Sequence, residues 1–83
     1  MILVYSKKKC PYCDMAKGFL KEKNLNFREI LLDEDEEARQ FMLSQGHKTV
    51  PQIYVNDTLL VEGGWSGLRQ LSDEELMNRI EQC

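Results

Sequence analysis

The 83-residue sequence has no long hydrophobic run and no excess of positive charge. Its longest apolar stretch, Met1–Tyr5, is far shorter than the roughly 20 residues that cross a bilayer, and it precedes the first lysines, whereas a secretory signal carries its positive charge first. With 11 Lys and Arg against 14 Asp and Glu, the net charge of −3 is unlike that of a nucleic-acid-binding domain. We therefore expect a cytoplasmic protein that binds neither membranes nor nucleic acid.

Cysteine is also scarce, and its count is odd. A disulfide framework in a small secreted domain uses an even number of cysteines, whereas this chain has three. Cys10 and Cys13 stand close together, and Cys83 is the last residue. In a reducing compartment such a close pair indicates redox chemistry or metal binding. The chain is 42% hydrophobic and 30% charged, which suits one folded domain over residues 1–83.

Hydrophobic patterning predicts alternating strands and helices. The predicted strands are Ile2–Tyr5, Phe27–Leu32, Thr49–Val55 and Leu59–Val61, the last two joined by a tight turn at Asn56-Asp57. The predicted helices run from about Pro11 to Lys23, from Asp33 to Gly46, and from Ser72 onward with a Ser72–Glu75 capping box. The resulting order, β-α-β-α-β-β-α, predicts an α/β fold with a small four-stranded mixed sheet and helices on both faces.

Two local features of the helices carry further expectations. The buried face of the first helix should consist of Met15, Ala16, Phe19 and Leu20. Gly18 lowers the helix propensity by about 1 kcal/mol relative to alanine, which suggests close packing at that position. In the second helix, Asp33 is the expected N-cap, with Glu36 three residues later as in a capping box.

The Cys10/Cys13 pair follows the first predicted strand and opens the first predicted helix. Residues three apart on a helix are neighbours, so the two sulfurs are within reach of a disulfide. The spacing therefore meets the requirement for a reversible dithiol.

The same placement assigns different roles to the two sulfurs. Only a thiolate is nucleophilic, and a sulfur at the N-cap can accept hydrogen bonds from the N–H groups of Tyr12 and Cys13, with weaker attraction from the lysines at 7–9. Cys10 is therefore the predicted nucleophile. Cys13 is the predicted resolving thiol, which attacks the mixed disulfide formed on Cys10.

A zinc site or a subunit-bridging iron–sulfur cluster is the alternative use of such a pair. Zinc takes four ligands, and the only other candidates, His47 and Cys83, stand at unsuitable spacings. We interpret His47 as a solvated loop residue and Cys83 as a thiol without a role, and we expect no metal.

Three motifs in this order resemble those of a dithiol glutaredoxin. They are Cys-Pro-Tyr-Cys at 10–13 after a short strand, Thr49-Val50-Pro51 before the third strand, and Gly63-Gly64 after the fourth. The resemblance covers nearly the whole chain. It implies the thioredoxin-like fold, reduction of protein disulfides and of glutathione mixed disulfides, and glutathione as the reducing co-substrate.

The resemblance also implies a substrate site. Pro51 matches the family's cis-proline, beside which Val50 presents its backbone N–H and C=O to the substrate. The residues implied to hold glutathione are Lys7, Tyr12, Lys48, Thr49, Val50, Gly64, Trp65 and Ser66. Among these, Ser66 is expected to cap a short helix near the γ-glutamyl end, and Lys7 and Lys48 to face the glycine carboxylate.

Trp65-Ser66-Gly67 is similar instead to a segment of the NrdH-type redoxins. These resemble glutaredoxins, but thioredoxin reductase reduces them and they supply electrons to ribonucleotide reductase. The indole of Trp65 narrows the γ-glutamyl pocket, docks a reductase or covers the core, so the reductant stays open between glutathione and thioredoxin reductase. We expect a monomer that acts on disulfide-containing proteins such as ribonucleotide reductase.

Overall fold

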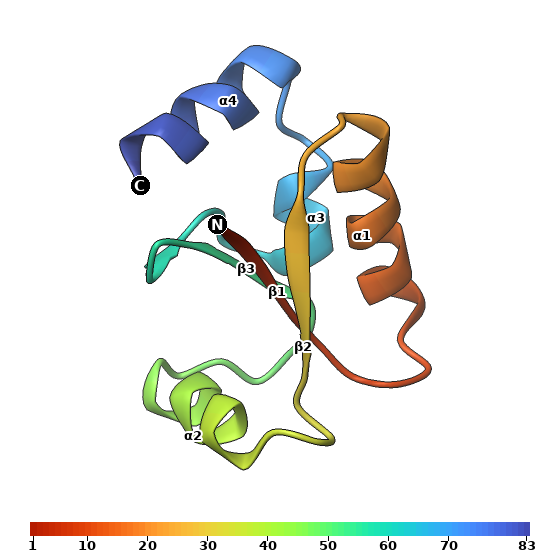
Figure 1. Ribbon diagram of the computed structural model, residues 1–83, viewed down its shortest axis with the longest axis vertical. Helices are drawn as coiled ribbons and strands as arrows, with labels where there is room; N and C mark the ends of the chain where they lie inside the picture. The colour runs from red at the N-terminus through yellow and green to blue at the C-terminus, as the bar shows by residue number, and fades with distance from the viewer.

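Four strands form one mixed sheet through the middle of the computed structural model, which describes all 83 residues (Figure 1). The strands are β1 (Ile2–Ser6), β2 (Phe27–Leu31), β3 (Gln52–Val55) and β4 (Thr58–Leu59), in the order β2-β1-β3-β4. Strand β1 pairs in parallel with β2 and antiparallel with β3. The predicted α/β fold with a four-stranded mixed sheet is therefore confirmed.

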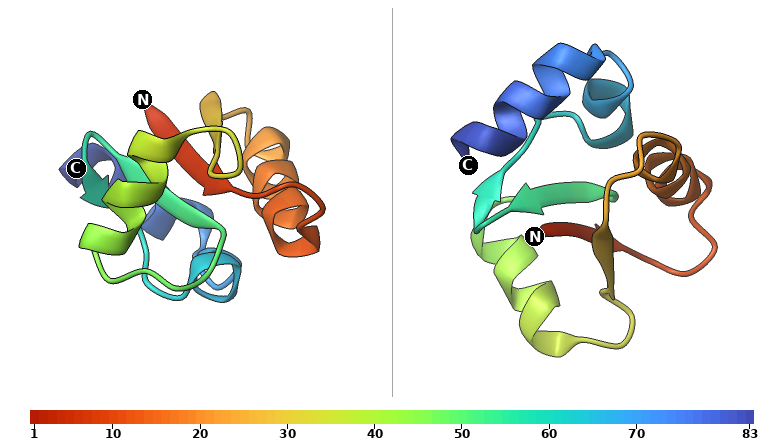
Figure 2. Two further views of the ribbon diagram at one scale, coloured as in Figure 1. Left: turned by 90° about the horizontal axis from the view of Figure 1, so that it is seen from below. Right: turned by 45° about the horizontal axis from the view of Figure 1, so that its top comes forward.

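Helices cover both faces of this sheet, as predicted (Figure 2). Helices α1 (Pro11–Glu22), α3 (Gly64–Leu68) and α4 (Asp73–Gln82) lie on one face, and α2 (Glu36–Ser44) lies alone on the other. The predicted element order omitted α3, because five residues give too short a periodic pattern to identify a helix. No helix is long and apolar enough to span a bilayer.

Each face of the sheet has its own hydrophobic core. Eleven buried residues join the sheet to α1, α3 and α4, namely Ile2, Val4, Ala16, Leu20, Ile53, Val55, Leu60, Val61, Leu68, Leu71 and Leu76. Five buried residues join it to α2, namely Tyr5, Leu32, Ala38, Met42 and Tyr54. The alternation of Ile53 and Val55 with Tyr54 along β3 divides the side chains between the two cores.

Several predicted turns and caps are confirmed. Asn56 and Asp57 have positive φ angles of 49° and 68°, as the tight hairpin turn between β3 and β4 requires. The Ser72–Glu75 capping box at the start of α4 is present in both directions. Gly46 follows α2 with φ +78°, where a side chain would be strained.

Three predictions about the helices are wrong. Asp35, not Asp33, is the N-cap of α2, and its carboxylate accepts the Ala38 N–H at 3.0 Å. Asp33 instead accepts the N–H of Lys8 at 2.8 Å, which fastens the loop before α1. In α1, Met15 is 51% exposed, because it lies well round the helix from the face that Ala16 and Leu20 bury.

The third wrong prediction is close packing at Gly18. A Cβ added there would meet nothing within 4 Å beyond the helix's own backbone, so no close packing explains this glycine.

A polar link fastens α1 to the sheet edge. Lys17 donates to Glu29 of β2 at 2.7 Å, and the buried hydroxyl of Ser6 donates to the same carboxylate oxygen at 2.7 Å. The hydrogen bond from Lys17, followed by that from Ser6, lowers the pKa of Glu29 below its ordinary value. The carboxylate thus stays ionised and joins β1, β2 and α1 at one point.

The two chain ends meet at the hairpin turn between β3 and β4. The amino group of Met1 donates to Asn56 Oδ1 at 3.4 Å, and Asn56 Nδ2 donates to the Cys83 carbonyl at 3.2 Å. Cys83 packs against the larger core, and its thiol is free. Both ends therefore lie at the start of β1, whereas Cys10 follows the end of that strand.

Candidate active site at the start of helix α1

Cys10 is the N-cap of α1, as predicted, and Pro11 is the first helical residue. The backbone of Cys10 is extended, with φ −112° and ψ 103°, and its sulfur accepts the N–H of Cys13 at 3.3 Å. The Tyr12 N–H, which was also expected to donate, makes no such bond in this state. Cys10 and Cys13 are joined in a disulfide, with their Cα atoms 5.2 Å apart. The structure thus describes the oxidised form of the pair.

The two sulfurs differ in their access to solvent. Cys13 is 1% exposed and belongs to the buried face of α1, whereas Cys10 is only partly buried at the open end of the helix. An outside thiol or disulfide can therefore approach Cys10 but not Cys13. This asymmetry agrees with the predicted division into an attacking and a resolving cysteine.

The segment Thr49-Val50-Pro51 separates two hollows. The Val50–Pro51 peptide bond is cis, as the resemblance implied. We call the first the backbone-lined hollow; it has a volume of about 290 Å³ and is lined by Tyr12, Thr49, Val50, Pro51, Gly63, Gly64, Trp65 and Ser66. We call the second the basic hollow; it has a volume of about 220 Å³ and is lined by Lys7, Leu32, Arg39, Met42, Leu43, His47, Lys48, Thr49 and Val50. The residues implied to hold glutathione are thus divided between the two.

Gly64 sets the shape of the backbone-lined hollow. Its φ is +57°, and a Cβ at this position would lie 2.6 Å from the Pro51 carbonyl oxygen. Only glycine permits the start of α3 to approach Pro51 this closely. The spacing between these two segments is therefore fixed by backbone rather than by side chains.

Ser66 does not cap α3, contrary to the prediction. The helix begins at Gly64, its N-cap is Gly63 with φ +88°, and no side chain bonds the cap. Ser66 is therefore inside the first turn, because the left-handed conformation of Gly63 starts the helix earlier than the serine signal suggested. Its side chain still lines the backbone-lined hollow, as the resemblance implied.

Trp65 both lines the hollow and covers the core. Its ring is half-buried against the larger core and meets Phe19 of α1 edge-to-face, with centroids 5.8 Å apart. Opposite it, Tyr12 is 61% exposed and forms another part of the same hollow. The Phe19–Trp65 contact joins α1 to α3, and Tyr12 and Trp65 line the hollow between these helices.

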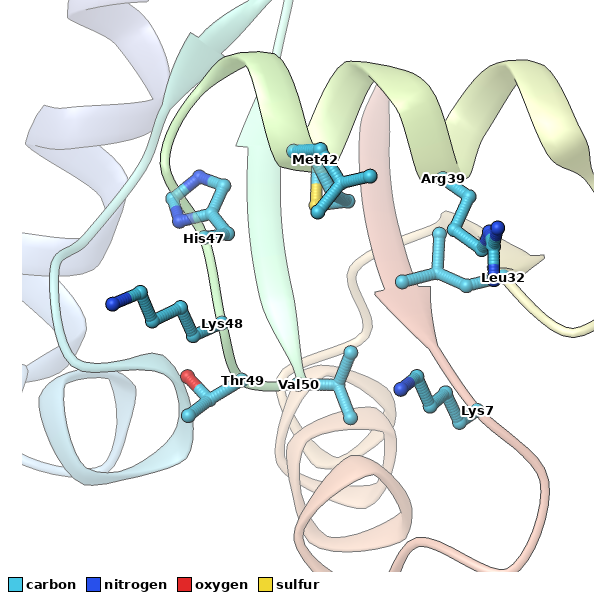
Figure 3. Close-up of a pocket in the computed structure, with 9 residues that line it drawn as sticks. Lys7, Leu32, Arg39, Met42, His47, Lys48, Thr49 and Val50 are labelled. Atoms are coloured by element: carbon cyan, nitrogen blue, oxygen red, sulfur yellow. The ribbon is translucent and has the colours of Figure 1, made fainter.

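The basic hollow gathers side chains from three parts of the chain (Figure 3). Lys7 precedes α1, Arg39 comes from α2, and His47 and Lys48 lie on the segment before Thr49. Because Lys7, Arg39 and Lys48 line it and no basic side chain lines the other hollow, it is the more electropositive of the two. Lys8, by contrast, points to Glu34, with its Nζ 2.8 Å from the carboxylate.

Sequence reasoning missed Arg39 and His47 in this hollow. The helical spacing of Arg39 with Met42 and Leu43 could have placed Arg39 beside the predicted core residue Met42. No sequence signal could have shown that this face of α2 borders Thr49 and Val50.

The prediction that His47 is a solvated loop residue is wrong, because its side chain is half-buried. Its Nε2 lies 2.7 Å from the hydroxyl of Tyr54, and the two rings meet edge-to-face with centroids 5.8 Å apart. Burial raises the pKa of the Tyr54 phenol, so the hydroxyl keeps its proton near neutral pH. The bond therefore ties the segment before Thr49 to strand β3.

No group of three or more metal-ligating side chains gathers anywhere in the structure. Cys83 lies at the opposite end of β1 from Cys10, and His47 is bonded to Tyr54. Neither of these candidates therefore stands with the cysteine pair as a metal ligand.

Comparison with known proteins matches residues 2–60 to the family described as Glutaredoxin. Among curated relatives, Glutaredoxin 1 of Rickettsia conorii is 35% identical over 82 residues, which covers 95% of this chain and 78% of the relative. Mitochondrial glutaredoxin-2 of Bos taurus is 34% identical over 87 residues, which covers 99% of this chain but 54% of the relative. The chain thus spans about half the length of the mammalian relatives it matches.

Solved structures show the same likeness. Glutaredoxin 1 from Francisella tularensis, complexed with cacodylate, has a TM-score of 0.71 at 30% identity and covers 92% of this chain and 95% of its own. The buckwheat glutaredoxin–glutathione complex has a TM-score of 0.77 at 22% identity, covering 99% of this chain and 77% of its own, which shows the fold alone. Together with the cysteine pair at the start of α1, these matches show that the chain belongs to the glutaredoxin family.

Proposed function

We propose that this chain is a glutathione-linked dithiol oxidoreductase that reduces protein disulfides and glutathione mixed disulfides. The observation that carries the proposal is the asymmetric Cys10–Cys13 disulfide, with one partly exposed sulfur at the N-cap of α1 and one buried a turn behind it. A structural staple would gain nothing from an accessible sulfur, whereas exchange with an outside thiol requires one.

The reaction with a protein disulfide takes two exchanges. The Cys10 thiolate attacks one substrate sulfur, forming a mixed disulfide and releasing the other substrate sulfur as a thiolate, which takes up a proton. The Cys13 thiolate then attacks the Cys10 sulfur, closes the Cys10–Cys13 disulfide and releases the second substrate thiolate. The substrate has gained two electrons and the enzyme has lost two.

Glutathione resets the pair in the reverse sense. One glutathione thiolate attacks the accessible Cys10 sulfur and frees the Cys13 thiol. A second glutathione attacks the resulting mixed disulfide, forming glutathione disulfide and freeing Cys10. With a glutathione mixed disulfide as substrate, the Cys10 thiolate attacks the glutathione sulfur and releases the other thiol. A further glutathione then attacks the Cys10–glutathione disulfide, which forms glutathione disulfide and frees Cys10 without Cys13.

The two hollows beside Cys10 support glutathione as the ligand. A tripeptide lying along Val50 would place its γ-glutamyl end in the backbone-lined hollow, near Gly64 and Ser66. Its glycine carboxylate would reach the basic hollow, where Lys7 and Lys48 carry positive charge. The Val50 backbone would bond the extended peptide as an added strand does.

A coupled assay tests the proposed reductant. NADPH oxidation is followed with a glutathione mixed disulfide as substrate, once with glutathione and glutathione reductase, and once with thioredoxin reductase alone. We expect turnover in the first mixture only. Turnover confined to the second would replace the proposal with a redoxin of the NrdH type, to which Trp65-Ser66-Gly67 is similar.

We also propose a monomer that works in the cytoplasm and reduces disulfide-containing proteins, with ribonucleotide reductase as the first to be tested. The odd cysteine count and the accessible Cys10 support exchange in a reducing compartment. The coupled assay is repeated with oxidised ribonucleotide reductase in place of the small substrate. If no NADPH is then consumed, ribonucleotide reductase is excluded as a partner.

A further inference from the structure

Gln52 is a buried polar residue that the disulfide chemistry does not use. It is 5% exposed on β3, opposite Tyr5 of β1 in the antiparallel ladder. Glutamine is seldom buried to this degree, because its amide needs hydrogen-bond partners to offset the loss of water. A leucine of similar size would fill the same position without that requirement.

The Gln52 side chain turns back over Val50 and Pro51 to bond Thr49. Its Nε2 donates to the Thr49 carbonyl at 3.0 Å and lies 3.3 Å from the Thr49 hydroxyl. Thr49 itself is exposed, whereas the Gln52 backbone is held in the sheet. The amide thus links a surface residue to an inner strand of the sheet.

A second fastening lies two residues further along β3. Tyr54, 3% exposed, bonds His47 through its hydroxyl at 2.7 Å. Side chains two apart on a strand point to the same face, so Gln52 and Tyr54 hold the segment 47–49 from one side. The segment 47–49, which lines the basic hollow and also lines the backbone-lined hollow at Thr49, is therefore tied to β3 at two points.

We infer that Gln52 is a positioning residue for substrate binding, with the Tyr54–His47 bond as a second fastening further along the chain from Val50. By fixing Thr49, it holds the Val50 backbone in the orientation in which it meets the peptide part of a glutathione mixed disulfide. This inference rests on the proposed glutathione-linked function. It concerns substrate affinity, not the reactivity of Cys10, because Gln52 touches neither sulfur.

Gln52→Leu tests the inference in turnover of a glutathione mixed disulfide. The variant keeps a similar side-chain volume and removes both bonds to Thr49, an exposed residue. We expect KM to rise about fivefold to tenfold with kcat within about twofold of wild type. We also expect the unfolding temperature to stay within about 4 °C and the alkylation rate of Cys10 to stay unchanged.

Two matched variants grade the effect. Tyr54→Phe removes only the hydroxyl that bonds His47 and should raise KM less than Gln52→Leu does. Gln40→Leu removes an exposed amide that bonds Glu36 at 2.9 Å within α2, and it should leave KM unchanged. An unchanged KM in Gln52→Leu overturns the inference, as does a KM rise accompanied by a large fall in unfolding temperature, which would indicate a merely structural role.

A measurement without turnover separates this inference from the proposed function. Backbone ¹⁵N order parameters at Thr49 and Val50 should fall in Gln52→Leu relative to wild type, while those at Ile53 and Val55 stay unchanged. Equal order parameters at Thr49 and Val50 in the two proteins would overturn the inference even if glutathione-linked turnover is confirmed. A fall in these values would support it even if thioredoxin reductase is the reductant.

Discussion

The two hollows beside Val50 are built in opposite ways. In the backbone-lined hollow the start of α3 lies against Pro51 at a distance that only Gly64 permits. In the basic hollow Lys7 and Lys48 are exposed side chains with long flexible stems, and their charges are not held by acidic partners. The first hollow offers a close approach set by backbone atoms, whereas the second offers positive charge on side chains that can move.

This difference teaches how a chain of 83 residues would divide recognition of the proposed ligand, glutathione. A rigid backbone surface discriminates by fit, because a misplaced group meets atoms that cannot move aside. Flexible charges attract any anion within reach and lose strength as salt screens them. Substitutions in the two hollows should therefore differ in size, in effect on stability and in salt dependence.

The largest expected effect is the loss of the proposed reaction itself. Cys10→Ser should abolish turnover of every substrate, because Cys13 is buried and the free thiol of Cys83 lies at the opposite end of β1 from the site. Cys13→Ser should lose protein disulfide reduction but keep turnover of small glutathione mixed disulfides, since glutathione can resolve these itself. NADPH-coupled assays with both substrate types measure the difference. Equal losses in the two variants would show that resolution always runs through Cys13.

Gly64→Ala should give the next largest effect, by breaking the fixed hollow. Its Cβ would meet the Pro51 carbonyl in a left-handed conformation, so we expect a loss of about 2–4 kcal/mol in unfolding free energy. We also expect a KM rise of at least about tenfold. Thermal unfolding and steady-state kinetics measure both.

Gly63→Ala is the matched control for this substitution. Gly63 shares the positive φ, but its Cβ would meet only Gly67, whose nitrogen would lie 3.4 Å and whose Cα 3.7 Å away. It should therefore lose only about 1–2 kcal/mol, the cost of the left-handed conformation. Equal stability of the two variants would indicate that the backbone at Gly64 can move aside, contrary to the comparison.

Lys7→Gln and Lys48→Gln should have smaller effects that salt erases. Each should raise KM for a glutathione mixed disulfide about twofold to fivefold at low ionic strength, the range of an exposed ion pair. In about 0.5 M salt the difference from wild type should largely vanish. Lys8→Gln removes a lysine that pairs with Glu34 outside the hollow and serves as the control. A salt-independent effect would mean that these lysines act by shape.

Gly18→Ala should have the smallest effect and should touch neither hollow. With nothing within 4 Å of the new methyl group, the variant should gain about 0.5–1 kcal/mol of stability from better helix propensity. Turnover should be unchanged, which separates stability from activity. Thermal unfolding measures the gain. A lower unfolding temperature than that of wild type would show that the added methyl group clashes with a neighbour.

The predictions from the sequence were most accurate for caps and turns, whose conformation depends on a few neighbouring residues. Cys10 as the N-cap before Pro11, the Asn56-Asp57 turn and the Ser72–Glu75 capping box are all present, because the bonds involved span three residues or fewer. The mixed sheet followed from the order of the elements and from the length of the crossover. The site motifs likewise stand within short segments.

The failures have longer-range causes. Asp33 and Asp35 have similar capping propensity, and the choice between them depends on the bond that Asp33 makes with Lys8, 25 residues away. His47 looked solvated because its partner, Tyr54, lies on a strand beyond the turn at Pro51. Arg39 reaches the basic hollow only because α2 packs beside Thr49 and Val50. Such contacts depend on how elements pack, which local patterns do not encode.

The side chain of Asn56, which bonds both chain ends, has a practical consequence for laboratory use of this protein. Because Met1 and Cys83 meet at the end of β1 remote from Cys10, a fluorescent reporter or surface tether joined there would project away from the reactive sulfur. Because Met1 and Cys83 lie close together, a short peptide could join them, and the chain could be cut in a loop elsewhere to give new termini. A circularly permuted redox sensor is therefore a natural engineering use of this fold.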